Sequence, residues 1–554
     1  MNAARPASLS KIGGLKPTAH LGSDVLVIGS GAAGMYAALA AARAGAQVLL
    51  VDRSLIGRGG ATVMAQMTVA VALGEEVPDH WEHHLADTVQ AGRGLCDEPL
   101  SRLLCEEAPS CIRELDAWGA GWARKNGHIS QVQAPGHDRP RCVYVDFVNT
   151  GPAVSKTLRA QLQRTSEVRR TGDLLVTELA LADGACVGAH AVHIATGRTI
   201  AIASKATIVA TGGLTRLYAR NSASLNMGGD GYALALAAGA ELVDMEFVQY
   251  FPIGHLAPRL VGMDPIMWDP FRYKLGGKLV NAEQREFLGE EGRYATARDH
   301  ATRAILEEVA QGRGSPHGGV WLSFQHCSET ELRAAFGPII DRLKANGIDL
   351  TRQAIEVAPI AHYHMGGIRV DANMRTAVPH LFAAGEAVGG ANGANRLSGN
   401  AITEALVFGR RAGERAAALA ARTPMPPAVG AAPARAAKRD INPAAEIVRL
   451  QALMNEHVGP LRTQAGLEHA LRHIAALAEP CAALRSPRGA FDAEWVDVHD
   501  LASMRLVAEC IARAALARIE SRGAHQRADF PATSPSWERH QRIRLGERGL
   551  SIES

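Results

Sequence analysis

The sequence is poor in aromatic residues, and its charges nearly cancel. Phe, Trp and Tyr make up 5% of the 554 residues, and 59 Lys and Arg stand against 56 Asp and Glu, a formal net charge of +3. So small a basic excess gives no electrostatic basis for binding nucleic acid or an acidic membrane. The scarcity of aromatic residues also leaves little for stacking against bases. We therefore expect no nucleic-acid partner.

The cysteines are few and scattered. The chain has 8 of them, and no two form a CxxC pair. This excludes the usual zinc sites, iron–sulfur ligand runs and thioredoxin-like redox motifs. We expect reduced thiols, no metal site and a cytoplasmic location.

Long apolar runs are also missing. Residues 1–22 lack the apolar core of a secretion signal and read as a flexible tail. No stretch approaches the roughly 18 uncharged apolar residues that a membrane-spanning helix needs. At roughly 100–200 residues per domain, the length predicts about three domains and no membrane span.

Glycine is abundant, and it forms a phosphate-binding pattern near the start of the chain. The apolar stretch 24–28 reads as a strand and leads into Gly29-Ser-Gly31-Ala-Ala-Gly34, followed by an alanine-rich helix up to residue 44. In this context Gly29 permits the tight turn, Gly31 lets the backbone approach a pyrophosphate, and Gly34 lets helix and strand pack closely. The alternative is a tight strand–helix turn without a ligand.

A second strand, 47–51, ends in Asp52, whose carboxylate can accept hydrogen bonds from both hydroxyls of a ribose. The motif alone does not separate FAD from NAD. The glycines of 57–60, 211–213 and 384–386 favour FAD, because side chains there would clash with a flavin.

Several stretches then carry a family resemblance. Residues 361–368 (AHYHMGGI), 382–386 (FAAGE) and 393–400 (GANRLSGN) resemble the flavoprotein subunit of succinate dehydrogenase and fumarate reductase. Residues 239–249 and 520–526 are similar to it as well, and the resemblance runs from residue 24 to about 545. L-aspartate oxidase and adenylylsulfate reductase belong to the same superfamily.

The resemblance implies an α/β fold, in which a Rossmann-like FAD-binding domain is interrupted by an α+β capping domain and followed by a C-terminal helical domain. Charged residues replace continuous apolar strands over 255–350, which fits such an insertion. The expected divisions are a tail (1–22), the FAD-binding domain (23–250 and 351–420), the capping domain (251–350), a Pro- and Ala-rich linker (421–444), and the C-terminal helical domain and tail (445–554).

The resemblance also implies the chemistry, which is hydride transfer between flavin N5 and a carbon next to a carboxylate. Arg298 matches the arginine that moves the other proton, and His362 and Arg396 match residues that hold the substrate carboxylate. A guanidinium fork grips a carboxylate at two points, which agrees with this role. The structural alternatives are an ion pair of Arg298 with Asp299 or Glu291, and a merely buried His362.

The expected cofactor is FAD. Its expected binding residues are Gly29, Gly31, Ala33, Gly34, Asp52, Arg53, Gly59, Gly60, Ala61, Thr62, Thr211, Gly212, Gly213, Asp230, Gly385, Glu386, Asn400, Ala401 and Ile402. Covalent members of the family carry a flavin-linked His where this chain has Ala61. Alanine cannot form that bond, so we expect non-covalent FAD.

Two departures concern the substrate. Phe251 stands where family members carry a carboxylate-binding His, and Trp268 stands where a hydroxyl is usual. We therefore expect a remodelled pocket for a less charged group, with the roles of Phe251, Trp268, Asp269 and Arg272 open.

Three functions follow. The first is an FAD-dependent oxidoreductase acting on a small carboxylate. The second is an electron-transfer flavoprotein subunit like adenylylsulfate reductase, with an iron–sulfur partner chain, and the third is a non-catalytic flavin-binding protein. The sequence leaves open the substrate, the direction of reaction, the electron partner and the oligomeric state.

Overall fold

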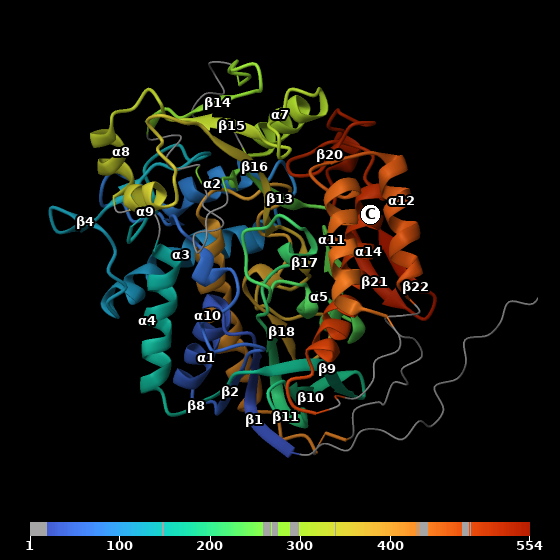
Figure 1. Cartoon of the computed structure of the whole chain (residues 1–554). Coiled ribbons are helices and arrows are strands. Elements are labelled where there is room, and N and C mark those ends of the chain that lie inside the picture. Colours follow the sequence, from blue (N-terminus) through green and yellow to red (C-terminus); the bar gives the residue numbers. More distant parts are fainter. Residues whose placement is uncertain are drawn as a thin grey trace, which may run out of the picture.

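A computed structural model describes residues 19–146, 149–258, 268, 275–288, 298–337, 339–427, 429–430, 441–478, 487 and 489–554. It has a large sheet at one end, a capping sheet at the other and a group of C-terminal helices along the side (Figure 1). The arrangement agrees with the expected α/β plan.

The large sheet follows the strand order β8-β2-β1-β11-β10-β9, with β18 paired to β11. Its strands are β1 (Ala19–Ile28), β2 (Val48–Val51), β8 (Val168–Thr171), β9 (Leu174–Ala182), β10 (Ala185–His193), β11 (Arg198–Val209) and β18 (Leu381–Ala383). β1 is parallel to both β2 and β11, as a βαβ unit requires. The strand begins at Ala19, so the expected N-terminal tail is shorter by a few residues.

Two helices pack closely beside this sheet. They are α1 (Ala32–Arg43) and α10 (Asn400–Ala420). A Cβ at Gly409 or Gly413 of α10 would stand 2.5 Å from the carbonyl oxygen of Ala33 or 2.2 Å from that of Ala37. Glycine on one helix and alanine on the other therefore let the two backbones approach, which holds the start of both helices at the same end of the sheet.

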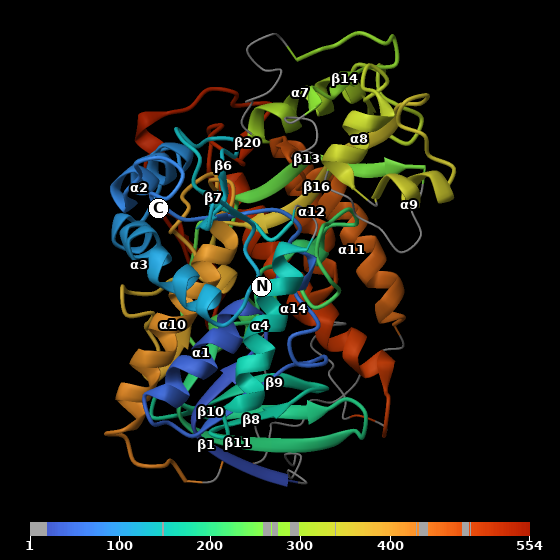
Figure 2. The same cartoon turned by 90° about the vertical axis from the view of Figure 1, so that its left-hand side faces the viewer.

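The capping domain is an antiparallel sheet with strand order β13-β16-β15-β14 and its own apolar core. Its elements are β13 (Val248–Ala257), β14 (Lys278–Val280), α7 (Arg298–Ala310), β15 (Val320–Ser323), α8 (Glu329–Phe336), α9 (Ile339–Ala345) and β16 (Ile355–His364). β13 and β16 run beyond the expected limits of 251–350 and connect the cap directly to the FAD-binding domain (Figure 2).

The C-terminal part contains α11 (Pro443–His457), α12 (Gln464–Ala476) and α14 (Ala493–Ala517). The last residues form a hairpin, β21 (Arg542–Gly546) and β22 (Gly549–Glu553). β21 pairs with β12 (Leu242–Val243), which itself pairs with β17 (Gly367–Ile368). The polar tail is therefore a strand pair attached to the FAD-binding domain. Elsewhere in the C-terminal part, β19 (Leu461–Arg462) pairs with β20 (Gln526–Arg527).

Further helices and short strands complete the fold. They are α2 (Trp81–Ala91), α3 (Glu98–Ala117), α4 (Thr150–Arg164), α5 (Asp230–Ala237), the strands β3 (Val69–Ala70), β4 (Arg124–Lys125), β5 (His128–Ile129), β6 (Gln131–Val132) and β7 (Cys142–Val143), and the short helices η1 (Thr62–Met64), η2 (Thr215–Leu217), η4 (Gly385–Ala387) and η5 (Pro535–Trp537). Among the residues that the structure describes, no helix is both long and apolar enough to cross a membrane.

Candidate active site

A large cavity opens where β1 ends and α1 begins. It encloses about 960 Å³, counting its opening to solvent. Gly29 has φ +101°, and a Cβ there would stand 2.4 Å from the carbonyl oxygen of Ala210. A Cβ at Gly34 would stand 1.8 Å from the carbonyl oxygen of Gly29. These two glycines serve the tight turn and the close packing that the sequence predicts.

Gly31 differs from both, because little of the protein fills the space beside it. A Cβ at this position would have only Thr62 Oγ1 within reach, at 3.5 Å. Gly31 also precedes α1 without capping it by a side chain. The N–H of Ala32 donates to Thr62 Oγ1 at 3.0 Å. A helix N-terminus beside open space suits a phosphate group. The cavity therefore fits the pyrophosphate of a dinucleotide.

Most of the expected cofactor residues line this cavity. They are Gly29, Gly31, Ala33, Asp52, Arg53, Gly59, Gly60, Ala61, Thr62, Thr211, Gly212, Asp230, Glu386, Ala401 and Ile402. Gly34, Gly213, Gly385 and Asn400 are not in the lining. The three glycines instead allow close packing, and the buried side chain of Asn400 hydrogen-bonds Thr88 and Asn392.

Asp52 lines the cavity but is already well supplied with donors. One carboxylate oxygen accepts from the backbone and side chain of Ser30, both at 2.7 Å, and the other from those of Ser54, both at 2.8 Å. A carboxylate has about four acceptor sites. The expected contact with a ribose therefore stays a prediction, and the structure gives Asp52 the additional task of holding the turn.

Arg53 and Asp230 connect the cavity to the C-terminal helices. The Arg53 guanidinium donates to both carboxylate oxygens of Asp500, at 2.7 and 2.9 Å. Burial raises the pKa of the nearby Asp230 to about 6, although Arg53 opposes this. Asp500 lies on α14, and no motif in the sequence pointed to it. Nothing in the sequence indicated that the β9 residues Leu174–Val176 line the cavity, because the sheet topology decides which strand lies there.

A second cavity, of about 620 Å³ counting its opening to solvent, adjoins the first. The two share Ala61, Ala65, Glu386, Ala401 and Ile402 as a common wall. The second cavity also contains His362, from β16, and Arg396, from the turn before α10. Two of the expected catalytic residues are therefore brought together from different segments, next to the cavity that fits FAD.

Arg396 is buried and packs against an aromatic ring. Its guanidinium carbon lies 4.3 Å from the ring centroid of Tyr363, and Nη1 donates to the carbonyl oxygen of Leu397 at 3.3 Å. The hydroxyl of Tyr363 donates to the carboxylate of Glu404, which also accepts from Asn392 at 2.7 Å. The buried network therefore fixes the aromatic surface on which Arg396 rests.

His362 is also held in position. Its Nδ1 lies 2.7 Å from the hydroxyl oxygen of Ser222, and its ring meets the ring of Phe251 edge-on at 5.6 Å between centroids. Glu386 separates the two cavities and accepts from the backbone N–H of His364 at 3.1 Å. Burial raises the pKa of the Glu386 carboxyl to about 8, so much of it is protonated at neutral pH.

Arg298 is the first residue of α7, and its side chain lies outside the described part of the structure. Met267, Asp269, Arg272 and Glu291 lie outside it as well. Their expected roles stay predictions.

Phe251 and Trp268 lie in the apolar core of the capping domain. Both side chains are fully buried, and Trp268 donates to His255 Nδ1 at 3.1 Å. Neither belongs to the described lining of the second cavity. Phe251 contacts His362 of the second cavity through its ring. It can therefore affect the substrate through the position of that histidine.

Comparisons with known proteins identify the family to which this chain belongs. The family model described as "FAD binding domain" matches residues 24–402, and the one described as "Fumarate reductase flavoprotein C-term" matches residues 448–551. A fumarate reductase (CoM/CoB) subunit of Methanothermobacter marburgensis is 35% identical over 533 residues, which cover 93% of this chain and 96% of that protein. L-aspartate oxidase of Streptomyces coelicolor is 34% identical over 563 residues, covering 96% and 93%.

Solved structures agree over nearly the whole chain. Sdh1 of Mycobacterium smegmatis, in complex with UQ1, has a TM-score of 0.86 at 34% identity, covering 97% of this chain and 94% of that one. Adenylylsulfate reductase of Archaeoglobus fulgidus has a TM-score of 0.77 at 18% identity, covering 97% and 96%, which shows the fold alone. The chain is therefore an FAD-dependent oxidoreductase and belongs to the flavoprotein family of succinate dehydrogenase, fumarate reductase and L-aspartate oxidase.

Proposed function

We propose that this oxidoreductase exchanges a hydride with a small carboxylate held in the second cavity. One observation carries the proposal: Arg396 and His362 lie together in a cavity that shares a wall with the cavity fitting FAD. Bound FAD supplies the hydride acceptor or donor at its N5 atom. The neighbouring carboxylate site would place the reacting carbon of the substrate beside that atom.

The protein's own residues divide the remaining work. The Arg396 guanidinium would bind the carboxylate at two points, in a buried place where such a charge contact is strong. His362, held by Ser222, would give a further directed contact. The family position of Arg298 supports it as the group that moves the proton to or from the neighbouring carbon. Positive charge near the carboxylate would also favour the carbanion-like density that builds up at that carbon.

The substrate class follows from the charges. Among the lining residues that the structure describes, Arg396 is the one Arg or Lys, and Met64 and Met67 add apolar surface. A second carboxylate would lack the cation that a His in place of Phe251 could provide, and an unpaired buried carboxylate is costly. A monocarboxylate, or a dicarboxylate with added apolar bulk, would therefore suit the cavity better than fumarate or succinate.

Another histidine does not replace the lost cation. His364 is buried below the site, where it contacts the Tyr232 hydroxyl at 3.3 Å and the carbonyl oxygen of Met245 at 3.1 Å. Burial lowers its pKa to about 4, so it is neutral. This supports the less charged substrate.

Non-covalent FAD and an electron partner complete the proposal. Ala61 lies in the common wall of the two cavities and has no atom that can link to a flavin. Without such a link, reduction of an activated double bond, or oxidation of an amino or hydroxy acid, is favoured over oxidation of succinate. The matching proteins include some named as subunits, which supports electron exchange with a separate chain. We place the protein in the cytoplasm.

The test is anaerobic. The purified yellow protein is mixed with amino acids, hydroxy acids and saturated dicarboxylates, and the chemically reduced protein with unsaturated mono- and dicarboxylates, while the flavin absorbance is followed. Bleaching or reoxidation by a carboxylate, lost in an Arg396→Leu variant that retains FAD, is the expected result. Equal reaction of the wild type and this variant would overturn the assignment of the carboxylate site.

A further inference from the structure

The start of α10 forms part of both cavities, and side chains of its first turn help to hold it there. Thr403 Oγ1 donates to the carbonyl oxygen of Ala70 at 2.6 Å, and Asn400 Nδ2 donates to Thr88 Oγ1 at 3.2 Å. Ala401 and Ile402 lie in the common wall, and Ser398 and Gly399 line the second cavity. Gly399 has φ +87° and precedes the helix without a side-chain cap. A Cβ there would stand 2.7 Å from the backbone nitrogen of Ala70, so the turn is pressed against β3.

Two buried histidines hold this turn from behind. His137 Nε2 lies 2.7 Å from the carbonyl oxygen of Ser398, and His84 Nε2 lies 2.8 Å from Asn400 Oδ1. Both partners are acceptors, so each ring donates through Nε2–H. The two hydrogen bonds hold Ser398 and Asn400, the residues immediately before and after Gly399, which has the left-handed conformation.

The imidazoles are neutral, and each has one nitrogen unused. Burial lowers the pKa of His84 to about 3 and that of His137 to about 4, and the charge of Arg141 acts in the same direction. In the described part of the chain, the Nδ1 atom of either ring has no hydrogen-bond partner. A buried polar atom without a partner costs about 1–3 kcal/mol. An apolar side chain would fill the same space without this cost, so packing alone does not explain the two histidines.

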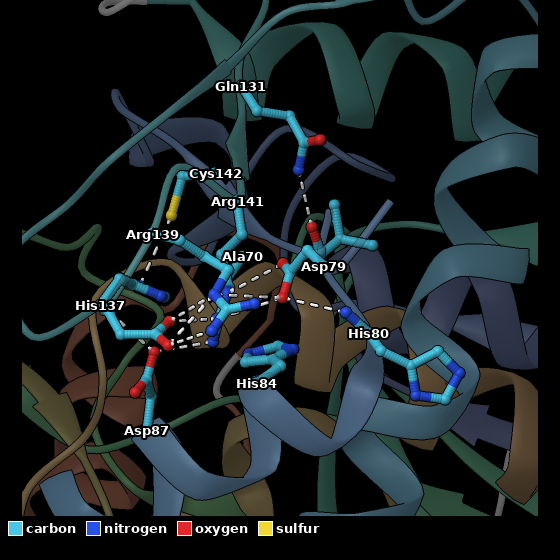
Figure 3. A network of polar contacts seen from close by, with 12 residues as sticks. Ala70, Asp79, His80, His84, Asp87, Gln131, His137, Arg139, Arg141 and Cys142 are labelled. Atoms are coloured by element: carbon cyan, nitrogen blue, oxygen red, sulfur yellow. Dashed lines mark hydrogen bonds and ion pairs between the residues drawn. The ribbon is translucent and has the colours of Figure 1, made fainter. Parts of the chain in front are cut away.

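An ion cluster around the buried Arg141 connects the segments that carry the two histidines (Figure 3). Arg141 donates to Asp87 at 2.8 Å and to Asp138 at 2.6 Å. Asp87 lies on α2, one turn after His84, and Asp138 follows His137 directly. Arg141 also pairs with Asp79 at 3.2 Å. One guanidinium therefore ties the helix carrying His84 to the loop carrying His137.

We propose that His84 and His137 are positioning residues that fix the N-terminus of α10 against bound FAD, and so set the affinity and the reduction potential of the flavin. This inference rests on the proposed function, in which FAD occupies the first cavity. The helix N-terminus carries about half a positive charge, which stabilises negative charge within its first turn. Electron density added to a flavin beside it is stabilised only while the turn 398–400 keeps its place.

The experiment removes the donors and retains the ring shape. The His84→Phe and His137→Phe variants lose the Nε2–H group, whereas His84→Gln and His137→Gln retain an N–H at a similar distance from the backbone. The matched control is His190→Phe, a buried histidine on β10 whose ring does not contact the turn. If a Phe variant does not fold, His→Leu at the same position replaces it. The FAD dissociation constant and the midpoint potential of bound FAD are measured for each.

The Phe variants are expected to bind FAD roughly fivefold more weakly, as loss of one buried hydrogen bond of about 1 kcal/mol implies. Their midpoint potentials should fall, whereas the Gln variants and the control should match the wild type. Phe variants with unchanged FAD affinity and unchanged midpoint potential would overturn the inference. A lower unfolding temperature alone would then show that the histidines serve the stability of the fold and do not act on the flavin. Gln variants impaired as much as the Phe variants would overturn it as well. A wild-type protein that binds no FAD would overturn the proposed function first.

Discussion

The guanidinium of Arg396 lies over the ring of Tyr363, 4.3 Å from its centroid. Tyr363 in turn donates its hydroxyl to the buried carboxylate of Glu404. The charge of Arg396 also acts on the buried carboxyls of Glu386 and Glu404, where it opposes the rise of their pKa values that burial causes.

Replacing Arg396 should affect substrate binding and leave FAD in place. Losing a buried two-point charge contact costs about 2–5 kcal/mol. We expect Arg396→Leu to raise the apparent KM and lower kcat/KM accordingly, at unchanged FAD content. His362→Leu should act in the same direction. Arg124→Leu, on an exposed arginine, is the control. Unaltered turnover in both site variants would contradict their roles.

Glu404 should make the fold more stable in acid than near neutral pH. Burial raises its pKa to about 7 from an ordinary value of 4.5, against the opposing effect of its hydrogen bonds and of Arg396. The folded state therefore binds the proton more tightly than the unfolded state does. The resulting stabilisation is complete below pH 4.5 and is lost as the pH rises toward 7.

Glu404→Gln cannot titrate, so it isolates this effect. The free energy of unfolding of the wild type, relative to that of the variant, should decrease between pH 4.5 and 7. Denaturant unfolding of the FAD-free proteins across this range measures it. The exposed Glu98→Gln serves as the control. A difference that stays constant or grows with pH would show that Glu404 is already ionised at low pH.

Gly31→Val should abolish FAD binding without preventing folding. The nearest protein atom to a Cβ at Gly31 is Thr62 Oγ1, at 3.5 Å, so the space belongs to the ligand. The measurement compares the ratio of flavin to protein with that of Gly22→Ala, where a Cβ has no neighbour within 4 Å. A Gly31→Val protein that purifies with normal flavin content would place the pyrophosphate elsewhere.

The sequence predicted the parts of the site that depend on short-range rules. Glycine at a strand–helix turn is required where a side chain would clash with nearby backbone. The roles of Gly29 and Gly34 therefore follow from local geometry. Asp500 was missed because it reaches Arg53 across 447 residues of sequence. His84 and His137 were missed for the same reason, since a histidine in a helix or loop gives no sign of the turn that it meets.

Phe251 shows a different limit. Comparing residue types predicted an aromatic wall of the substrate site, but residue type does not tell which way a side chain points on a strand. Phe251 lies on β13 and belongs to the capping core together with Trp268, and its ring contacts His362 of the site. The prediction about substrate charge therefore rests on the missing cation, and no longer on an apolar surface in contact with the substrate.

The flavin should be released by acid. Ala61 offers no atom for a covalent bond, so precipitation of the protein should leave the yellow colour in the supernatant. Colour that stays with the precipitated chain, located by digestion to a flavin-bearing peptide, would show attachment at another residue.

The final prediction concerns substrate charge. Phe251 stands where the family resemblance places a carboxylate-binding His, so a second carboxylate would lack that partner, and an unpaired buried carboxylate is costly. Fumarate and succinate should therefore be poor substrates, and a monocarboxylate or a dicarboxylate with added apolar bulk should have the higher kcat/KM. Measuring kcat/KM for fumarate, succinate and L-aspartate against less charged analogues decides the matter. Efficient turnover of fumarate or succinate would mean that a residue outside the described lining supplies the second cation. Arg272 would then be the first to replace, and the family assignment would be unaffected.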